Sequence, residues 1–261
     1  FSNSVSPSTE SRKFKNCLVT GGAGFIGSHL VERLLSEGYH VAVIDDFSEG
    51  KKENLPKHKN LLVVRASILG NISKYIARNE VIFHLAAIPR LQRSLDQPWK
   101  SNRVNIDGTL KLLLLAKKHK VKKFIFASSS SVYGNQKSLP MTETMVPNPL
   151  VPYSLQKLAG EQYCQMFSRL YGLETISLRY FSVYGPRMNP EGQYALLIPK
   201  FIKIISQDIA PTINGDGRQV RDFTYVSDAV EATLLAAKSD ISGKVFNIGK
   251  GESISVNEVA K

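Results

Sequence analysis

Tyr153 and Lys157 lie four residues apart in a stretch whose pattern predicts a helix, so their side chains share one face of it. A free tyrosine titrates at about pH 10 and is a poor base at neutrality, but a nearby ammonium together with a positive nicotinamide ring would stabilise the phenolate and lower that pKa. Such a pair can exchange a proton with a substrate hydroxyl. An isolated Tyr-x-x-x-Lys is also compatible with a plain helix-surface pair, so its meaning depends on the rest of the chain.

A glycine-rich stretch upstream gives that pair its context. Gly21, Gly24 and Gly27 lie between a predicted strand and a predicted helix, where a tight turn and a close pyrophosphate both exclude side chains. The helix N-terminus offers unpaired N–H groups and a favourable dipole to the phosphates. The next predicted strand ends at Asp45, eighteen residues after Gly27, where a carboxylate accepts from the adenosine ribose and repels a 2′-phosphate. The chain is therefore predicted to bind NAD rather than NADP, and the tyrosine–lysine pair then indicates nicotinamide chemistry.

Four consecutive serines, residues 128–131, follow an apolar run at 124–127. If that run is a strand of an open sheet, the serines lie at the carboxyl edge, where ligands bind. One hydroxyl there can hydrogen-bond the reacting oxygen and relay its proton. The alternative is a polar turn whose hydroxyls bond only to backbone.

Short apolar runs alternate with amphipathic stretches along most of the chain, which is the pattern of a doubly wound α/β fold with right-handed crossovers. Continuous apolar runs, rather than strict alternation, are typical of a Rossmann-like parallel sheet that is covered on both faces. The predicted strands are 17–20, 40–45, 61–64, 81–85, 123–127, 175–179 and 245–248, and the predicted helices are 26–37, a helix through 111–118, and 153–171.

We expect three segments along the chain. Residues 1–14 are predicted to be a disordered or tag-like tail, and residues 15–180 an NAD-binding Rossmann domain. Residues 181–261 are expected to be mostly a substrate-binding region with segments that return to the Rossmann sheet. A helix start at Ser255 lies close to the last residue, so we expect this region to be incomplete at its C-terminus.

Composition and charge exclude several classes of protein. With 43% hydrophobic and 21% charged residues, and no apolar run near the ~20 residues that span a bilayer, the chain is typical of a soluble cytoplasmic protein without a membrane partner. Cys17 and Cys164 are predicted to be buried free thiols in a reducing compartment. The net charge of +12 is spread over helix faces and turns without a nucleic-acid motif, so we predict no nucleic-acid partner and no metal site.

Six motifs occur in the order found in extended short-chain dehydrogenases/reductases of the NAD-dependent epimerase/dehydratase family. The chain resembles this family from about residue 16 to residue 260, and within it the UDP-glucose and UDP-N-acetylglucosamine 4-epimerases. The motifs are the glycine-rich stretch 20–30, His84-Leu85-Ala86-Ala87, Asn105-Ile106-Asp107-Gly108-Thr109, Ser131-Val132-Tyr133-Gly134, the segment 179–187, and the segment 221–226.

The resemblance implies site residues at the matching positions. Ser129, with Ser130 as its nearest rival, would act with Tyr153 and Lys157 in catalysis. The resemblance also implies that NAD is contacted by Gly21, Gly24, Phe25, Ile26, Gly27, Asp45, Asp46, Ser48, Gly50, Ser67, Ile68, Leu85, Ala86, Ala87, Asn105, Tyr153, Lys157 and Tyr180. A UDP-sugar would be contacted by Ser129, Ser130, Tyr153, Ser182, Tyr194, Leu197, Ile198 and Arg221, with the Arg221 guanidinium on the diphosphate.

Three departures from the family pattern bear on these contacts. Ser182 stands where the family usually has Asn, which alters one substrate contact. Ser67 stands where the family usually has Asp, which removes an acceptor near the adenine. The family's second phosphate-binding arginine falls beyond Lys261.

The resemblance implies a reaction that begins with oxidation of the sugar at C4 and gives a 4-keto intermediate. Dehydratases of the family carry an Asp-Glu pair, and decarboxylases a Glu, just before Val-Tyr-Gly, whereas this chain has Ser130 and Ser131. Without those acids, hydride is expected to return to the same carbon. The resemblance therefore implies a UDP-sugar 4-epimerase that retains its NAD.

Two other functions remain open. A UDP-glucuronate 4-epimerase is the runner-up, because Arg90 or Arg93 can meet a sugar carboxylate. A catalytically silent NAD-binding scaffold or sensor is the alternative from another class. The resemblance also implies a homodimer formed through a four-helix bundle of the helices over 102–118 and 152–171.

Overall fold

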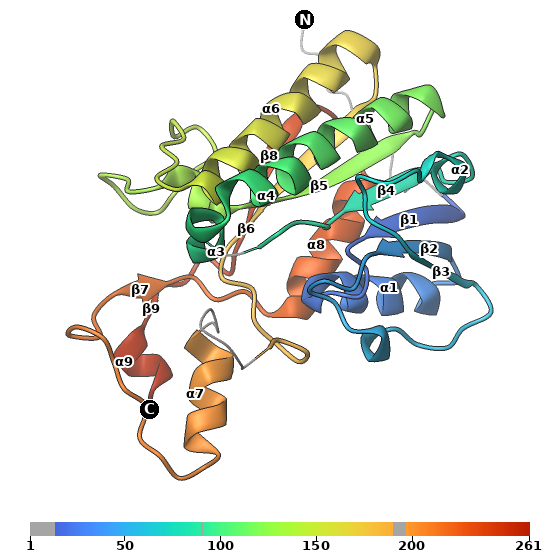
Figure 1. Cartoon of the computed structure of the whole chain (residues 1–261). Coiled ribbons are helices and arrows are strands. Elements are labelled where there is room, and N and C mark those ends of the chain that lie inside the picture. The colour runs from blue at the N-terminus through green and yellow to red at the C-terminus, as the bar shows by residue number, and fades with distance from the viewer. Residues whose placement is uncertain (1–13, 90, 190–196) are drawn as a thin grey trace, which may run out of the picture.

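The computed structural model describes residues 14–89, 91–189 and 197–261, and its centre is a seven-stranded parallel sheet (Figure 1). The strand order is β3-β2-β1-β4-β5-β6-β8, which reverses direction between β1 and β4. The predicted doubly wound Rossmann-like fold is therefore confirmed. The strands are β1 (Asn16–Thr20), β2 (His40–Asp45), β3 (Leu61–Arg65), β4 (Val81–His84), β5 (Lys123–Ser129), β6 (Glu174–Tyr180) and β8 (Lys244–Ile248).

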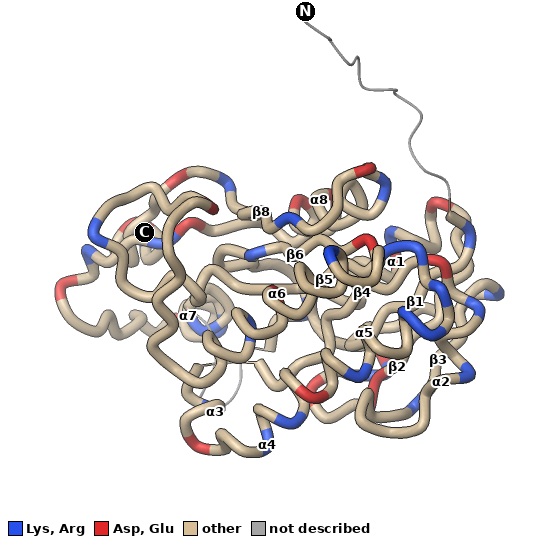
Figure 2. Tube along the Cα trace, turned by 90° about the horizontal axis from the view of Figure 1, so that it is seen from above, with Lys and Arg blue, Asp and Glu red and all other residues tan. Residues whose placement is uncertain are grey.

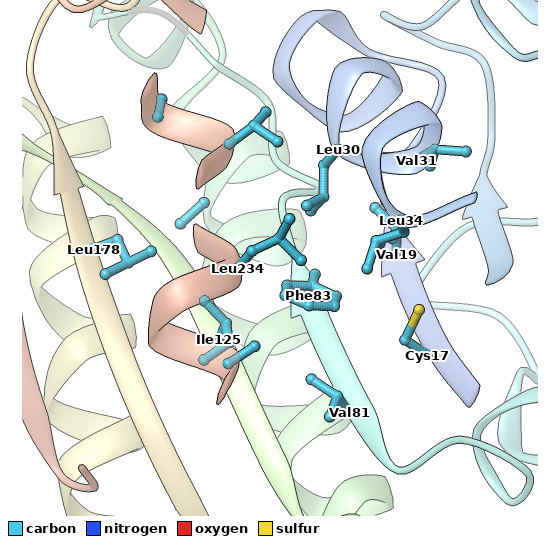
Figure 3. Close-up of a cluster of buried hydrophobic side chains, with 14 of the residues drawn as sticks. Cys17, Val19, Leu30, Val31, Leu34, Val81, Phe83, Ile125, Leu178 and Leu234 are labelled. Carbon is cyan, nitrogen blue, oxygen red and sulfur yellow. The ribbon is translucent and has the colours of Figure 1, made fainter. Parts of the chain in front are cut away.

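Helices cover both faces of this sheet, because successive strand residues point to opposite sides. On one face, α1 (Phe25–Ser36) and α8 (Val226–Lys238) bury Leu30 and Leu234 against Phe83 of β4, as Figure 3 shows. On the other face, the neighbouring Ile82 packs beneath α2 (Ser73–Ile76), α5 (Gly108–Lys118) and α6 (Pro152–Tyr171). Both cores are apolar, which explains why the central strands lack polar–apolar alternation.

The helical segment over 91–118 is less regular than the sequence indicated. It consists of α3 (Leu91–Asp96), α4 (Pro98–Asn102), a π-helical turn η2 (Arg103–Asp107) and then α5. A Cβ on Gly108, the first residue of α5, would lie 2.5 Å from Ile68 Cδ1, so the chain passes close to that side chain here. The single helix expected over 102–118 is therefore wrong in its first turns. Insertions of this kind are common near functional sites.

Residues beyond 180 contribute to two parts of the structure. The helix α8 and strand β8 complete the Rossmann layers beside α1 and β6. The remaining elements are α7 (Leu197–Ile205), β7 (Val220–Arg221), β9 (Ile254–Ser255) and α9 (Val256–Val259), which lie beyond the carboxyl edge of the sheet (Figure 1). The helix start predicted at Ser255 is confirmed, since Ser255 and Glu258 form a capping box.

The structure also places the two cysteines. Cys17 and Cys164 are free and buried, as predicted. Within the described ranges, no helix is both long and apolar enough to cross a membrane. In the same residues, no group of three or more His, Cys, Asp and Glu side chains is placed so that it could hold a metal ion.

Two shorter helical turns, η1 (Lys52–Asn54) and η3 (Ser130–Tyr133), complete the described elements.

The packing of α6 against β5 gives a first testable prediction. A Cβ on Gly160 would lie 2.7 Å from Cε1 of Phe126, a ring that is 1% exposed and cannot move aside. We expect Gly160→Ala to lower the free energy of unfolding by about 1–3 kcal/mol, because overpacking outweighs the helix propensity gained. Urea denaturation measures this. Gln162→Ala, on the exposed side of α6, is the control, and an equally stable Gly160→Ala protein would contradict the prediction.

Candidate active site

A cavity of about 750 Å³ opens at the carboxyl ends of the central strands. Its wall includes Gly21 after β1, Asp45 at the end of β2, Leu85 after β4, Ser129 at the end of β5 and Tyr180 at the end of β6. Five separate strands therefore deliver residues to one space, and ligands bind open α/β sheets at this place, where the strand order reverses.

The glycine loop forms the floor of this cavity. Gly21 has a φ of +71°, and a Cβ there would lie 2.7 Å from the Ala86 nitrogen, so the turn requires glycine. At Gly24, the N-cap of α1, a Cβ would meet only the Gly21 oxygen at 3.2 Å, and Gly24 faces the cavity. The first N–H groups of α1 have no intrahelical partner. A bare backbone with free donors fits a pyrophosphate.

Asp45 lies beside this loop with a carboxylate that is 7% exposed. Its Oδ2 accepts from the Ala23 N–H at 2.9 Å and its Oδ1 from the Phe47 N–H at 2.8 Å. Burial raises the pKa of Asp45, and these two hydrogen bonds oppose the rise. Each oxygen keeps acceptor capacity for a ribose hydroxyl. Together, the loop, the helix end and Asp45 fit a dinucleotide.

The proton-transfer group is assembled from α6 and β5. Tyr153 lies in the first turn of α6, where its backbone N–H donates to Ser94 Oγ at 3.0 Å, and its phenol is hydrogen-bonded to Ser129. One turn later, Lys157 Nζ donates to the Ala127 carbonyl at 2.7 Å and lies 5.7 Å from the centre of the Tyr153 ring. All three side chains line the cavity. The structure thus brings together the serine, tyrosine and lysine proposed from the sequence.

Burial is the main influence on the pKa values of Tyr153 and Lys157. The pKa of Tyr153 is raised to about 12, because burial disfavours the phenolate more than the hydrogen bond from Ser129 favours it. Burial also lowers the pKa of Lys157 to about 8, so the ammonium is only moderately favoured at neutral pH. Desolvation is therefore the main influence on the pKa of Tyr153 in the protein without a nicotinamide ring. The lowering expected from Lys157 together with that ring stays a prediction.

The run of serines divides into distinct roles. Ser129 faces the cavity and contacts Tyr153, while its Oγ also accepts from the Ser131 N–H at 3.2 Å. Ser128 lines the cavity too, but its hydroxyl donates to Glu161. Ser130 belongs to η3 and lies outside the described cavity wall. The geometry therefore favours Ser129 over its rival Ser130.

Most residues expected to contact NAD line the cavity, but Asn105 does not. Its amide is 3% exposed and donates to the Ile88 carbonyl at 3.1 Å and to Gln156 Oε1 at 2.7 Å, while its Oδ1 accepts from the Ile88 N–H at 2.8 Å. Asn105 therefore ties the loop after β4 to the catalytic helix α6. The expected residues that do line the wall are Gly21, Gly24, Phe25, Ile26, Gly27, Asp45, Asp46, Ser48, Gly50, Ser67, Ile68, Leu85, Ala86, Ala87, Tyr153, Lys157 and Tyr180.

The residues expected to bind the nucleotide half of a substrate are not gathered in the same way. Ser182 lines the cavity with a φ of +29°. Leu197 and Ile198 belong to α7 and Arg221 to β7, and none of the three reaches the described wall, so the expected cluster is not formed there. Arg221 is exposed and donates to the Val220 carbonyl. Tyr194, like Arg90, lies outside the described residues.

One cavity residue had no assigned role in the sequence. Arg187 lines the wall and donates to Ser28 Oγ at 3.1 Å and to Glu32 Oε1 at 2.5 Å, so it fastens the segment after β6 to α1. His29 reinforces this junction through a 3.0 Å contact with the Pro186 carbonyl oxygen. The only sequence signal was that Arg187 ends a recognised motif, and its partners are about 155 residues away.

Known proteins share both the sequence and this architecture. A UDP-glucose 4-epimerase from Mycolicibacterium smegmatis is 39% identical over 251 residues, which cover 93% of this chain and 79% of that protein. The structure of a UDP-N-acetylglucosamine 4-epimerase from Methanobrevibacter ruminantium in complex with UDP-N-acetylmuramic acid superposes with a TM-score of 0.92 at 41% identity, covering 95% of this chain and 80% of that one. A UDP-glucuronic acid 4-epimerase from Bacillus cereus, solved with UDP-glucuronic acid and NAD, gives a TM-score of 0.86 at 39% identity over 93% and 80% of the two chains.

The profile of one family covers nearly the whole of the dinucleotide fold described above. It is that of the NAD-dependent epimerase/dehydratases, and it matches residues 17–249. The match includes the glycine loop, the serine run and the Tyr153–Lys157 helix. The chain therefore belongs to the NAD-dependent epimerase/dehydratase family.

Proposed function

We propose that this chain is an NAD-dependent UDP-sugar 4-epimerase, which interconverts UDP-glucose with UDP-galactose, UDP-N-acetylglucosamine with UDP-N-acetylgalactosamine, or both. One observation carries the proposal. Ser129, Tyr153 and Lys157 line the cavity together, and no carboxylate of its described wall comes from β5 or α6, the two elements that carry these residues. The carboxylates of the described wall, Asp45, Asp46 and Glu49, come instead from β2 and the segment after it.

The protein groups perform the proton steps. Ser129 holds the reacting sugar oxygen, and Tyr153 removes the proton from the O4 hydroxyl and later returns it. Lys157 places positive charge beside the phenolate that this transfer creates. Bound NAD supplies the acceptor of the C4 hydride and, as NADH, its donor. An elimination or decarboxylation needs a further acid or base, and β5 and α6 supply no carboxylic acid to the described wall.

A UDP-glucuronate 4-epimerase is the second candidate, because cationic side chains also line the cavity. Arg93 is paired with Glu49 and Arg187 with Glu32, so the positive charge of both is already compensated. Neither arginine is then free to meet a sugar carboxylate, so a neutral hexose is the first candidate, although Lys51 and Lys100 also line the wall. Incubation of the protein with UDP-glucose, UDP-N-acetylglucosamine and UDP-glucuronate, followed by chromatography of the products, discriminates the candidates. Bound NAD without conversion of any of them would instead support a silent NAD-binding scaffold.

We also propose a cytoplasmic homodimer. Large apolar side chains are exposed on the outer surface of the α4–α6 layer: Trp99 is 77%, Leu114 51%, Leu155 55% and Leu170 58% exposed. Pairing of α5 and α6 with those of a second copy would cover them in a four-helix bundle. The buried free thiols suit a reducing compartment.

The catalytic role of Tyr153 can be tested by removing only its hydroxyl. We expect Tyr153→Phe to lower kcat for UDP-sugar epimerisation by about 10²-fold or more, because no other described cavity residue at this end can replace the phenol as base. Affinity for NAD and the melting temperature should stay close to those of the unchanged protein. Turnover within a few-fold of normal would refute the mechanism.

The ribose role of Asp45 gives a separate prediction. Asp45→Ala is expected to weaken NAD binding about tenfold or more, since it removes a carboxylate acceptor and loosens the loop held through the Ala23 N–H. Calorimetric titration with NAD and with UDP measures the difference. Glu53→Ala removes an exposed carboxylate from the following segment and serves as control. Equal losses of NAD and UDP affinity would contradict the assignment.

The dimer is tested by charge insertion. Leu114→Glu combined with Leu155→Glu should convert a dimer into a folded monomer, because four carboxylates would then face one another across the bundle. Light scattering after size-exclusion chromatography gives the mass, and circular dichroism checks the fold. A monomeric unchanged protein would rule out the dimer.

A further inference from the structure

A buried ion pair lies behind the cavity. Glu161 of α6 is 1% exposed and Arg179 of β6 is 4% exposed. The pair is bidentate, since Arg179 Nε donates to Oε1 at 2.9 Å and Nη2 donates to Oε2 at 2.7 Å. Neither residue lines the cavity. A buried ion pair adds little to the free energy of unfolding on average, because desolvation offsets the attraction between the charges. Stability alone therefore does not explain why this pair is present.

Glu161 continues the series that the catalytic residues begin. Tyr153, Lys157 and Glu161 follow one another at intervals of four residues on α6 and therefore share one face. Glu161 Oε1 also accepts from Ser128 Oγ, and Ser128 lies between Ala127, whose carbonyl holds Lys157, and the catalytic Ser129. One carboxylate is thus bonded to the strand segment that positions both partners of Tyr153.

Arg179 is held from its other side. Its guanidinium carbon lies 4.6 Å from the centre of the Tyr133 ring, and the Tyr133 hydroxyl donates to Asn247 Oδ1 at 2.6 Å. Arginine does not deprotonate in proteins. The guanidinium is therefore a permanent positive charge beside the Glu161 carboxyl group, and its contact with the Tyr133 ring restricts its movement.

We propose that Glu161 is a positioning residue for the proposed epimerase, and that Arg179 holds its charge in place so that Lys157 stays an ammonium beside Tyr153. The inference rests on the proposed function for its kinetic consequence only. It makes Glu161 part of the acid–base apparatus without contact with substrate or NAD.

The charges around Lys157 support this role. Burial lowers its pKa to about 8 and the Glu161 carboxylate opposes that fall. Burial lowers the pKa of His84 to about 3 and raises that of Cys164 to about 12, so both are neutral at pH 7. Among the described groups that face Lys157, Glu161 therefore supplies the negative charge. These groups are Tyr153, Glu161 and Cys164 on α6 and His84 on β4, while Arg179 on β6 is bonded to Glu161.

The sign of the effect follows from these charges. Lys157 is an ammonium below its pKa and loses its proton as the pH rises through it. Removal of the Glu161 charge lowers that pKa, so the ammonium is lost at a lower pH and the phenolate of Tyr153 loses its neighbouring charge there. We expect Glu161→Gln to move the alkaline limb of the kcat profile at least one pH unit downward, a tenfold loss of kcat above it, with KM little changed.

The direct test does not need turnover. The NAD-saturated protein is labelled with ¹³Cε-lysine, the Lys157 resonance is assigned with Lys157→Met, and it is titrated by NMR. We expect a midpoint at least one pH unit lower in Glu161→Gln than in the unchanged protein. An unchanged or higher midpoint would overturn the inference. If the shift appears but no UDP-sugar is converted, the proposed epimerase activity fails while the electrostatic role of Glu161 stands.

Because Glu161→Gln leaves Arg179 buried without its partner, a second variant separates electrostatics from folding. Glu161→Gln with Arg179→Gln replaces the ion pair by a neutral hydrogen-bonded pair. If the Glu161 charge acts on Lys157, the midpoint stays lowered in the double variant, by less than in Glu161→Gln because the positive charge of Arg179 is removed as well. A return to the unchanged midpoint would show that the shift in Glu161→Gln came from the uncompensated Arg179 charge and would overturn the inference. Glu161→Asp keeps the charge and should retain most of the midpoint.

A surface pair provides the matched control. Glu231 accepts from Arg33 at 2.9 Å, and both side chains are largely solvated. Glu231→Gln removes a carboxylate from an arginine just as Glu161→Gln does, but far from the cavity. Its Lys157 titration and pH profile should match those of the unchanged protein, and a comparable shift there would contradict a local effect of Glu161.

Discussion

Parallel pairing of the strands from β2 to β6 brings their carboxyl ends to one edge, and the chemically active side chains are attached at or just beyond that edge. The register of β5 with β6, which aligns Ser129 with Tyr180, sets the end of the cavity where proton transfer is proposed. The register of β1 with β2 sets the other end, where the glycine loop meets Asp45. A slip of one residue would turn these groups toward the wrong face.

Burial has opposite effects on the two groups that share the proton chemistry. It fixes Tyr153 and Lys157 in position, but it also disfavours the charged form of each, so the pKa of the phenol rises and that of the amine falls. A site that depends on a phenolate beside an ammonium therefore needs a further charge to offset desolvation. In our proposal the Glu161 carboxylate, held by Arg179, provides one such charge for Lys157, and a cationic cofactor ring would provide another for the phenolate.

Much of this arrangement was readable from the chain. Apolar runs located all seven strands of the parallel sheet to within two residues at each end, because buried parallel strands lack alternation. The helix α8 is not among the predicted helices. Its apolar residues nevertheless recur at helical spacing and are buried: Val226, Ala229, Val230 and Leu234. The π-helical turn η2 was not predicted, since apolar spacing does not distinguish such a turn from the α-helix that it interrupts.

By itself, the sequence determined the class of fold, the glycine loop with Asp45, and the pairing of Tyr153 with Lys157, because each depends on residue type and short-range spacing. The tertiary structure decided which serine reaches the tyrosine and that Asn105 braces the loop after β4. It also decided that Arg179, eighteen residues from Glu161, holds the carboxylate behind Lys157. These last features depend on side chains from separate strands and helices meeting in a space from which water is excluded. The local sequence pattern does not predict such contacts between distant residues. Burial then determines the hydrogen bonds and the pKa values of the side chains that make them.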